Sequence, residues 1–151
     1  RKVLYVDKVE SPHGLRISSH IGSFNPAHAT GLGKVLLAYL PDEVRNETLD
    51  FIFNQDELKS YTTSTIIDKT HMIRELSLIR VNQYAIDKEE FEMGLICVAI
   101  PIFNQNQQVV ASLSASGPAS RFKENEIQRY VDILKKGAKG IQEKIGTFKL
   151  L

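Results

Sequence analysis

The side chains with the most chemical potential in this sequence are one thiol, one carboxylate and two hydroxyls. Cys97 is the single cysteine among 151 residues, Asp87 precedes it, and Ser114 and Ser116 alternate along a later apolar segment. A carboxylate accepts hydrogen bonds and hydroxyls both donate and accept, so the set suits a small polar ligand. With His28, however, Cys97 and Asp87 also supply the nucleophile, base and orienting group of covalent catalysis. Two hypotheses follow, a binding site and a small enzyme that uses Cys97 as nucleophile or redox thiol.

Two predicted strands, at residues 94–103 and 109–117, determine which of these groups can share a face. A polar connection joins the strands into a hairpin, and strand side chains alternate between two faces. Requiring apolar residues to meet on one face leaves two registers, with Cys97 opposite Ser114 or Ser116. The other face is either the floor of a pocket or a solvated sheet surface. It carries a group of small side chains: Cys97, Ala99, Ser112, Ser114 and Ser116.

The stretch NPAHATGLGKVLLAYL, residues 25–40, contains a second candidate feature. A helix is predicted over residues 29–40, although Gly31 and Gly33 at its start each cost about 1 kcal/mol relative to alanine. Bare amides at the positive end of a helix bind carboxylates, and glycine lets an anion approach the backbone closely. The alternative is a tight turn packed against a neighbour. His28 is interpreted as bonding its own loop, with anion ligand and pocket wall as the alternatives.

The remaining pattern predicts a single domain of the α+β (α/β) class with a mainly antiparallel sheet. Further strands are expected at residues 2–10, 14–19 and 84–86, and further helices at 41–53, 69–82 and 123–147. Asp68 is the predicted N-cap of the helix at 69–82, in which Ile73, Leu76 and Ile79 recur at helical spacing. The last helix repeats apolar residues at heptad spacing, which indicates either a helix lying on the sheet or a seam for a partner helix.

Composition and charge argue against several classes of function. A net charge of +1 without a basic cluster makes this domain alone a poor binder of DNA. The four histidines lack HxH or HxxxH spacing, so no metal and no cofactor are expected. The GxxxxGK[ST] motif of phosphate-binding loops is absent. A single cysteine, no membrane-length apolar run and no signal peptide predict a cytoplasmic protein, and the abrupt start predicts a piece of a longer chain.

Three ordered blocks resemble the effector-binding domain of IclR-type transcriptional regulators. They are PAHATGLGKVLLAYLP, YAIDKEEFEMGLICVAIPIF and VVASLSASGPASRF, and the resemblance covers nearly the whole chain. It implies a GAF-like fold, with helices around the sheet, and a pocket for a small organic acid such as glyoxylate, pyruvate or a sugar acid. It also implies a homodimer or homotetramer. DNA contact is expected only through an N-terminal winged helix-turn-helix domain outside residues 1–151, and no membrane contact is expected.

The resemblance further implies roles for individual residues. The implied effector contacts are Gly31, Leu32, Asp87, Cys97, Ser114 and Ser116, and the candidate pocket wall comprises Leu15, Ile17, His28 and Ala99. Asp87 would accept a hydrogen bond from an effector hydroxyl or hold a loop amide, because two adjacent carboxylates repel each other. Two positions depart from the family pattern. Gln83 replaces a frequent glycine, so Asn82 is expected to take the left-handed turn, and Leu32 replaces smaller residues, which predicts a narrower pocket.

Overall fold

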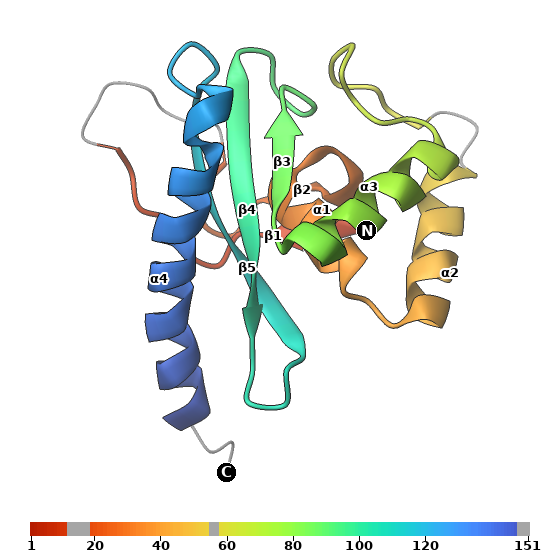
Figure 1. Cartoon of the computed structure of the whole chain (residues 1–151). Helices are drawn as coiled ribbons and strands as arrows, with labels where there is room; N and C mark the ends of the chain where they lie inside the picture. Colours follow the sequence, from red (N-terminus) through yellow and green to blue (C-terminus); the bar gives the residue numbers. More distant parts are fainter. Residues whose placement is uncertain (12–18, 55–57, 148–151) are drawn as a thin grey trace.

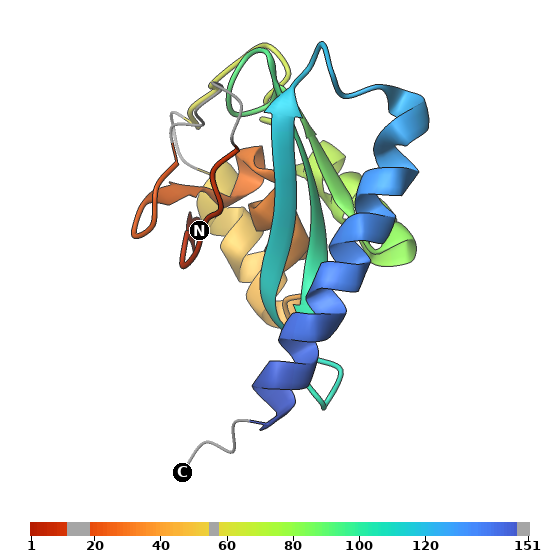
Figure 2. The same ribbon diagram turned by 90° about the vertical axis from the view of Figure 1, so that its left-hand side faces the viewer.

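A three-stranded antiparallel sheet lies between two layers of helices (Figures 1 and 2). The computed structural model describes residues 1–11, 19–54 and 58–147. The central sheet has the order β3-β4-β5, formed by β3 (Ala85–Lys88), β4 (Leu95–Phe103) and β5 (Val109–Pro118). Helix α4 (Ile127–Thr147) packs on one face, and α1 (Gly31–Ala38) packs on the other. The predicted α+β class with a mainly antiparallel sheet is confirmed.

The β4–β5 hairpin adopts one of the two predicted registers. Cys97 pairs with Ser116 and Val98 with Ala115, so the apolar residues of both strands meet on the same face. Helix α4 covers that face, and Val131, Leu134 and Ala138 of α4 are buried against the sheet. The interpretation of this helix as one lying on the sheet is confirmed for these turns. Its later seam residues Ile141 and Ile145 are each 37% exposed.

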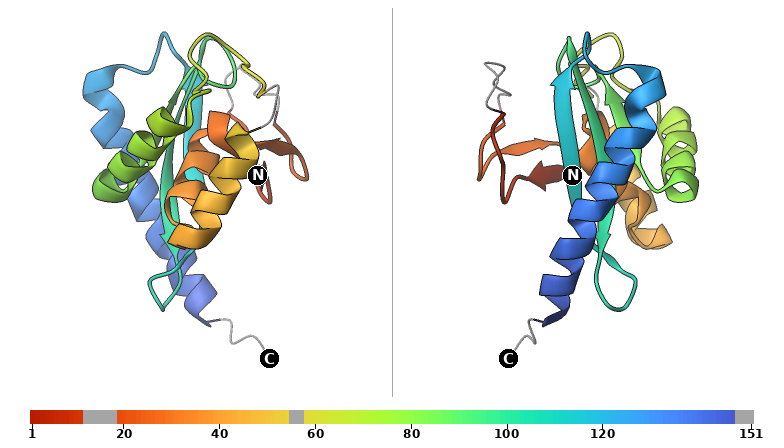
Figure 3. Two further views of the ribbon diagram at one scale, coloured as in Figure 1. Left: turned by 90° about the vertical axis from the view of Figure 1, so that its right-hand side faces the viewer. Right: turned by 60° about the vertical axis from the view of Figure 1, so that its left-hand side comes forward.

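The second core lies between the sheet and three helices. Besides α1, these are α2 (Asp42–Phe53) and α3 (Lys69–Asn82), which Figure 3 shows beyond the sheet from α4. The predicted cap of α3 is confirmed, because the Asp68 side chain accepts a hydrogen bond from the His71 amide at 2.7 Å. Of the three apolar residues that recur at helical spacing along α3, Leu76 and Ile79 are buried and Ile73 is 44% exposed, whereas Met72 is fully buried.

The N-terminal strands differ most from the prediction. The expected strand at 2–10 is confined to β1 (Lys2–Leu4), which pairs with an unpredicted strand, β2 (Phe24–Pro26), in a separate two-stranded sheet. Most of the strand expected at 14–19 lies outside the described residues. The short helices η1 (Ala27–Ala29) and η2 (Glu124–Glu126) precede α1 and α4. Among the described helices, none combines the length and apolarity that a bilayer crossing requires.

Candidate effector site

The N-terminus of α1 carries two buried amides without a described partner. Thr30 is the N-cap: its hydroxyl accepts from the Gly33 amide at 3.3 Å, and its carbonyl accepts from the Lys34 amide at 2.9 Å. The amides of Gly31 and Leu32 receive no such acceptor within the described ranges, although both residues are buried. Buried amides are almost always satisfied by protein, water or ligand. The helix start therefore offers two donors to an acceptor from outside the helix.

Both glycines of this helix start lie where the packing leaves little room for a side chain, and only at Gly33 is the obstacle a backbone closer than 3.0 Å. A Cβ at Gly31 would lie 3.3 Å from the Ala99 Cβ and 3.3 Å from the Cys97 Sγ. A Cβ at Gly33 would lie 2.6 Å from the Ala27 carbonyl carbon and nearer still to its oxygen and Cα. The first turn of α1 therefore lies directly over the small residues of β4. The hypothesis of a solvated sheet face is wrong here, because Cys97 is 8% and Ala99 0% exposed.

Three of the sequence-predicted polar residues form one row across the sheet. Asp87 of β3 pairs with Cys97 of β4, and Cys97 pairs with Ser116 of β5. Ser114 pairs with Ala99 in the next row on the same face. The structure thus gathers the predicted residues of α1, β3, β4 and β5 around one small region. Leu32 joins this region through its backbone, since its carbonyl accepts from the Ser112 hydroxyl at 3.2 Å, and its side chain packs in the core.

Asp87 is a buried carboxylate that accepts a hydrogen bond from the loop after β3. It is 4% exposed, and its Oδ1 accepts from the Glu90 amide at 2.7 Å. Burial raises the pKa of Asp87 to about 7, and the nearby Glu90 carboxylate adds to this rise. The loop-amide role expected for Asp87 as one of two alternatives is therefore observed.

Cys97 lies in an environment that suppresses thiol reactivity. Burial raises the pKa of Cys97 to about 11, although hydrogen bonds with the Ser116 and Ser114 hydroxyls act in the opposite direction. A reactive cysteine needs a lowered pKa from a nearby positive group or base. At neutral pH this side chain is a neutral thiol that can only donate and accept weak hydrogen bonds.

His28 lies in an aromatic cluster and not beside Cys97. Its ring contacts Phe53 and Tyr61 with centroid distances of 6.2 and 6.0 Å, and it bonds to the backbone of Lys59. The favoured interpretation, a bond within its own loop, is therefore wrong. Its Nε2 is buried without a partner among the described residues, and burial lowers the pKa of His28. None of these contacts provides Cys97 with a base.

A buried lysine, whose surroundings the sequence did not predict, lies next to the site. Lys34 of α1 is 1% exposed, and its Nζ donates to Glu90 at 2.5 Å, Glu75 at 2.9 Å and the Ile86 carbonyl at 2.7 Å. Burial alone would lower the pKa of Lys34, but the two carboxylates outweigh it and raise the pKa overall. The lysine therefore remains charged and joins α1 to α3 and to the segment from Ile86 to Glu90.

A residue that the sequence did not predict for the site is Tyr5, which follows β1. Its phenol is half-buried, hydrogen-bonds to Asn25, and interacts electrostatically with Cys97 and Asp87. Burial raises the pKa of Tyr5, so the phenol stays neutral and able to donate. The alternation of Val3 and Tyr5 along the N-terminal segment was the available signal for a side chain that faces inward.

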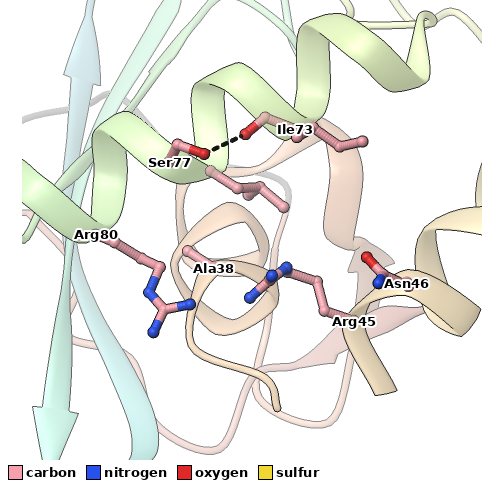
Figure 4. Close-up of a pocket in the computed structure, with 7 residues that line it drawn as sticks. Ala38, Arg45, Asn46, Ile73, Ser77 and Arg80 are labelled. Carbon is pink, nitrogen blue, oxygen red and sulfur yellow. Dashed lines mark hydrogen bonds between the residues drawn. The ribbon is translucent and has the colours of Figure 1, made fainter. Parts of the chain in front are cut away.

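A surface hollow lies at the opposite end of α1 (Figure 4). Its residues come from α1, α2 and α3: Ala38, Arg45, Asn46, Ile73, Leu76, Ser77 and Arg80. Its two arginines have structural partners: Arg45 pairs with Asp42 at 2.9 Å and also reaches the Leu40 carbonyl, and Arg80 pairs with Asp42 at 3.5 Å. Because the hollow is separate from Asp87, Cys97 and Ser116, we place the candidate site at the N-terminus of α1.

Two residues of the predicted pocket wall, Leu15 and Ile17, lie outside the described residues. Within the described ranges, no group of three or more histidine, cysteine, aspartate or glutamate side chains is arranged to hold a metal ion.

Comparison with known proteins places this arrangement in a class of bacterial regulatory domains. Residues 1–143 match the family described as bacterial transcriptional regulator IclR C-terminal. The crystal structure of IclR from Thermotoga maritima superposes with a TM-score of 0.87 at 39% identity, covering 96% of this chain and 57% of that one. An IclR homolog from Microbacterium hydrocarbonoxydans in complex with 4-hydroxybenzoate gives a TM-score of 0.81 at 25% identity, covering 95% and 56%.

The chain belongs to the IclR C-terminal domain family, and its fold is GAF-like. Among its curated relatives, the HTH-type transcriptional regulator KdgR of Dickeya chrysanthemi is 39% identical over 144 residues, 95% of this chain and 46% of that protein. The chain thus spans about half the length of the curated relatives it matches. By name these relatives are transcriptional regulators and repressors.

Proposed function

We propose that this chain is the effector-sensing domain of a transcriptional regulator and that it binds a small organic carboxylate. The carboxylate of the effector accepts hydrogen bonds from the amides of Gly31 and Leu32. The other polar groups of the effector meet Asp87, Cys97, Ser114 and Ser116, and Tyr5 supplies a further donor. The observation that carries this proposal is the buried pair of amides that have no acceptor among the described residues, above the row of Asp87, Cys97 and Ser116.

The chemistry of these groups suits an anion with additional oxygen atoms. The helix N-terminus has positive partial charge, and the sheet beneath it offers neutral donors and acceptors of small size. The homolog that was solved with 4-hydroxybenzoate and the PobR inducer-binding domain that was solved with 3-hydroxybenzoic acid both carry aromatic acids. For this chain, the close approach of the first turn of α1 to Cys97 and Ala99 favours a compact acid, with glyoxylate, pyruvate and sugar acids as the first candidates.

The signal passes from this domain to DNA through the rest of a longer protein. We place residues 1–151 as one effector domain, joined in the full regulator to an N-terminal winged helix-turn-helix domain. The subunits associate as a homodimer or homotetramer, and the effector acts by binding one subunit arrangement more tightly than the other. The net charge of +1 for this chain agrees with DNA contact made elsewhere.

The test is calorimetry on acids first selected by a thermal-shift screen. Ser116→Ala removes one hydrogen bond to an uncharged oxygen of the effector and should weaken binding about 2- to 10-fold, since a hydrogen bond between neutral groups contributes about 0.5–1.5 kcal/mol. Ser77→Ala, at an exposed position of α3, removes a hydroxyl that donates to the Ile73 carbonyl of the same helix, and serves as the control. Equal affinity of both variants and the wild type would place the effector elsewhere.

The enzyme hypothesis is the second candidate, and the geometry weakens it. The pKa of Cys97 is raised to about 11, and the contacts of His28 are with other residues. Redox chemistry would need a resolving cysteine, and the chain has one cysteine. Turnover of a candidate acid that disappears in Cys97→Ala would restore the enzyme hypothesis.

A further inference from the structure

The buried charges around Asp87 do not balance. Three carboxylates, Asp87, Glu90 and Glu75, stand near one cation, Lys34. Asp87 and Glu90 are 4% and 5% exposed, so little solvent screens them. If every group were ionised, the cluster would carry two negative charges more than positive ones before any effector entered.

Lys34 is already committed to the other two carboxylates. Its Nζ lies 2.5 Å from Glu90 Oε1 and 2.9 Å from Glu75 Oε1. Asp87 instead accepts hydrogen bonds from the backbone of Glu90 and Phe91, and these bonds and the charge of Lys34 lower its pKa by less than burial raises it. The remaining oxygen of Glu90, Oε2, is buried without a partner in the described part of the chain. Keeping a buried carboxylate ionised without enough partners for its charge costs several kcal/mol of free energy. A carboxylate in this position takes up a proton instead.

Among the described residues, no other element facing Asp87 supplies a compensating positive charge. Tyr5, after β1, and Cys97, on β4, are both neutral acids, and Ser116 on β5 is uncharged. Glu90 in the loop after β3 adds negative charge, and Lys34 on α1 is shared with Glu75 of α3. A carboxylate effector at the amides of Gly31 and Leu32 would add one more negative charge.

We propose that this site takes up its carboxylate effector together with one proton, held by the Asp87–Glu90 pair as a neutral Asp87 carboxyl group. This inference rests on the proposed function and specifies its chemistry. A neutral carboxyl group donates a hydrogen bond, which an ionised one cannot do. Asp87 then selects an effector with an oxygen acceptor next to its carboxylate, as in 2-oxo acids, and binding weakens as the pH rises.

The first experiment needs no effector. A titration of the free protein, followed by the carboxyl 13C resonance of Asp87, should give a midpoint near neutral pH, where burial raises the pKa to about 7. Assignment comes from the resonance that disappears in Asp87→Asn. A midpoint near the ordinary value of about 4 would overturn the proton part of the proposal, whatever the protein binds.

The second experiment measures protons during binding. Calorimetry with pyruvate at pH 8, in phosphate and in Tris buffer, should show uptake of close to one proton per pyruvate bound. Above pH 7 the affinity of the wild type should fall about tenfold per pH unit, because one proton is linked to binding. Asp87→Asn should bind with no proton exchange and a flat pH profile. Asp42→Asn, which removes an exposed carboxylate far from the site, should behave like the wild type.

The outcomes separate the two proposals. Pyruvate binding to the wild type without proton exchange overturns the present inference and leaves the proposed function intact. Failure of pyruvate, glyoxylate and gluconate to bind at any pH counts against the proposed function, while the 13C titration still decides the state of Asp87. An Asp87→Asn variant that retains the wild-type pH profile assigns the proton to another group and also overturns the inference.

Discussion

Replacing Gly33 by alanine should destabilise the protein strongly, although alanine is the better helix former. The new Cβ would lie 2.6 Å from the Ala27 carbonyl carbon, with two further Ala27 backbone atoms still nearer. That backbone cannot rotate away, because the Ala27 amide bonds to the Arg1 carbonyl at 3.1 Å and the Thr30 hydroxyl to the Pro26 carbonyl at 2.9 Å. Either η1 or α1 must move.

The magnitude follows from two opposing contributions. Gly→Ala inside a helix gains about 1 kcal/mol, whereas forcing an atom into a packed core costs about 1–3 kcal/mol and more where backbone must shift. We expect a net loss of about 2 kcal/mol in the free energy of unfolding, measured by urea denaturation followed by circular dichroism. For a domain of this size, this corresponds to a fall of about 4–8 °C in Tm.

Two other glycines serve as matched controls. A Cβ at Gly140 in α4 would have no neighbour within 4 Å, so Gly140→Ala should raise stability by about 0.5–1 kcal/mol. The Cβ of Gly31→Ala would lie 3.3 Å from the Cys97 Sγ and the Ala99 Cβ and 3.5 Å from the Cys97 carbonyl oxygen, so this variant should keep most of the stability while losing carboxylate binding. A Gly33→Ala variant as stable as the wild type, with an unchanged m-value, would refute the close packing of η1 on α1.

Three further predictions concern single residues. Gln83, with φ of 61°, holds a left-handed conformation, so Gln83→Gly should raise the free energy of unfolding by about 0.5 kcal/mol in urea titrations. Cys97 should react with iodoacetamide at pH 8 at least about 100-fold more slowly in the folded protein than in urea, since burial raises its pKa. Burial lowers the pKa of His28 in the folded protein below its unfolded pKa of 6.5. The stability that the neutral imidazole contributes is therefore fully present above pH 6.5, and it is lost as the pH falls through the lower pKa of the folded state. His28→Phe should reduce this acid loss in thermal melts, whereas His71→Phe on exposed α3 should not.

The local patterns predicted the elements that their own residues determine. The bounds of α3, residues 69–82, agree with the prediction, because Asp68 caps the helix and its apolar residues recur at helical spacing. The hairpin register was reduced to two choices because a slip by one residue moves every side chain to the other face. The left-handed turn after α3 was assigned to Asn82 but occurs at Gln83, a shift of one residue that propensity does not resolve.

Features made by distant segments escaped the sequence analysis. The pairing of β1 with β2 joins two strands of three residues, too short to show alternation. The burial of Lys34 was not predicted, because nothing near it in sequence indicates that Glu75 and Glu90 will surround it. The sequence and the family resemblance named most residues of the candidate site. The fold added Tyr5 and the buried charges of Lys34, Glu75 and Glu90.

The buried Lys34 also bears on how the chain folds. Its side-chain partners lie 41, 52 and 56 residues further along the chain, so all three contacts close long loops. Loop closure costs entropy before any contact compensates it, and a lysine without its partners does not leave water. We therefore expect the first turn of α1 to reach its final position late, after α3 and the β3–β4 pair have formed. The strands that form the floor of the site would then be in place before the helix end that closes over them. Because the contacts of Lys34 form late, Lys34→Met should change the unfolding rate far more than the folding rate.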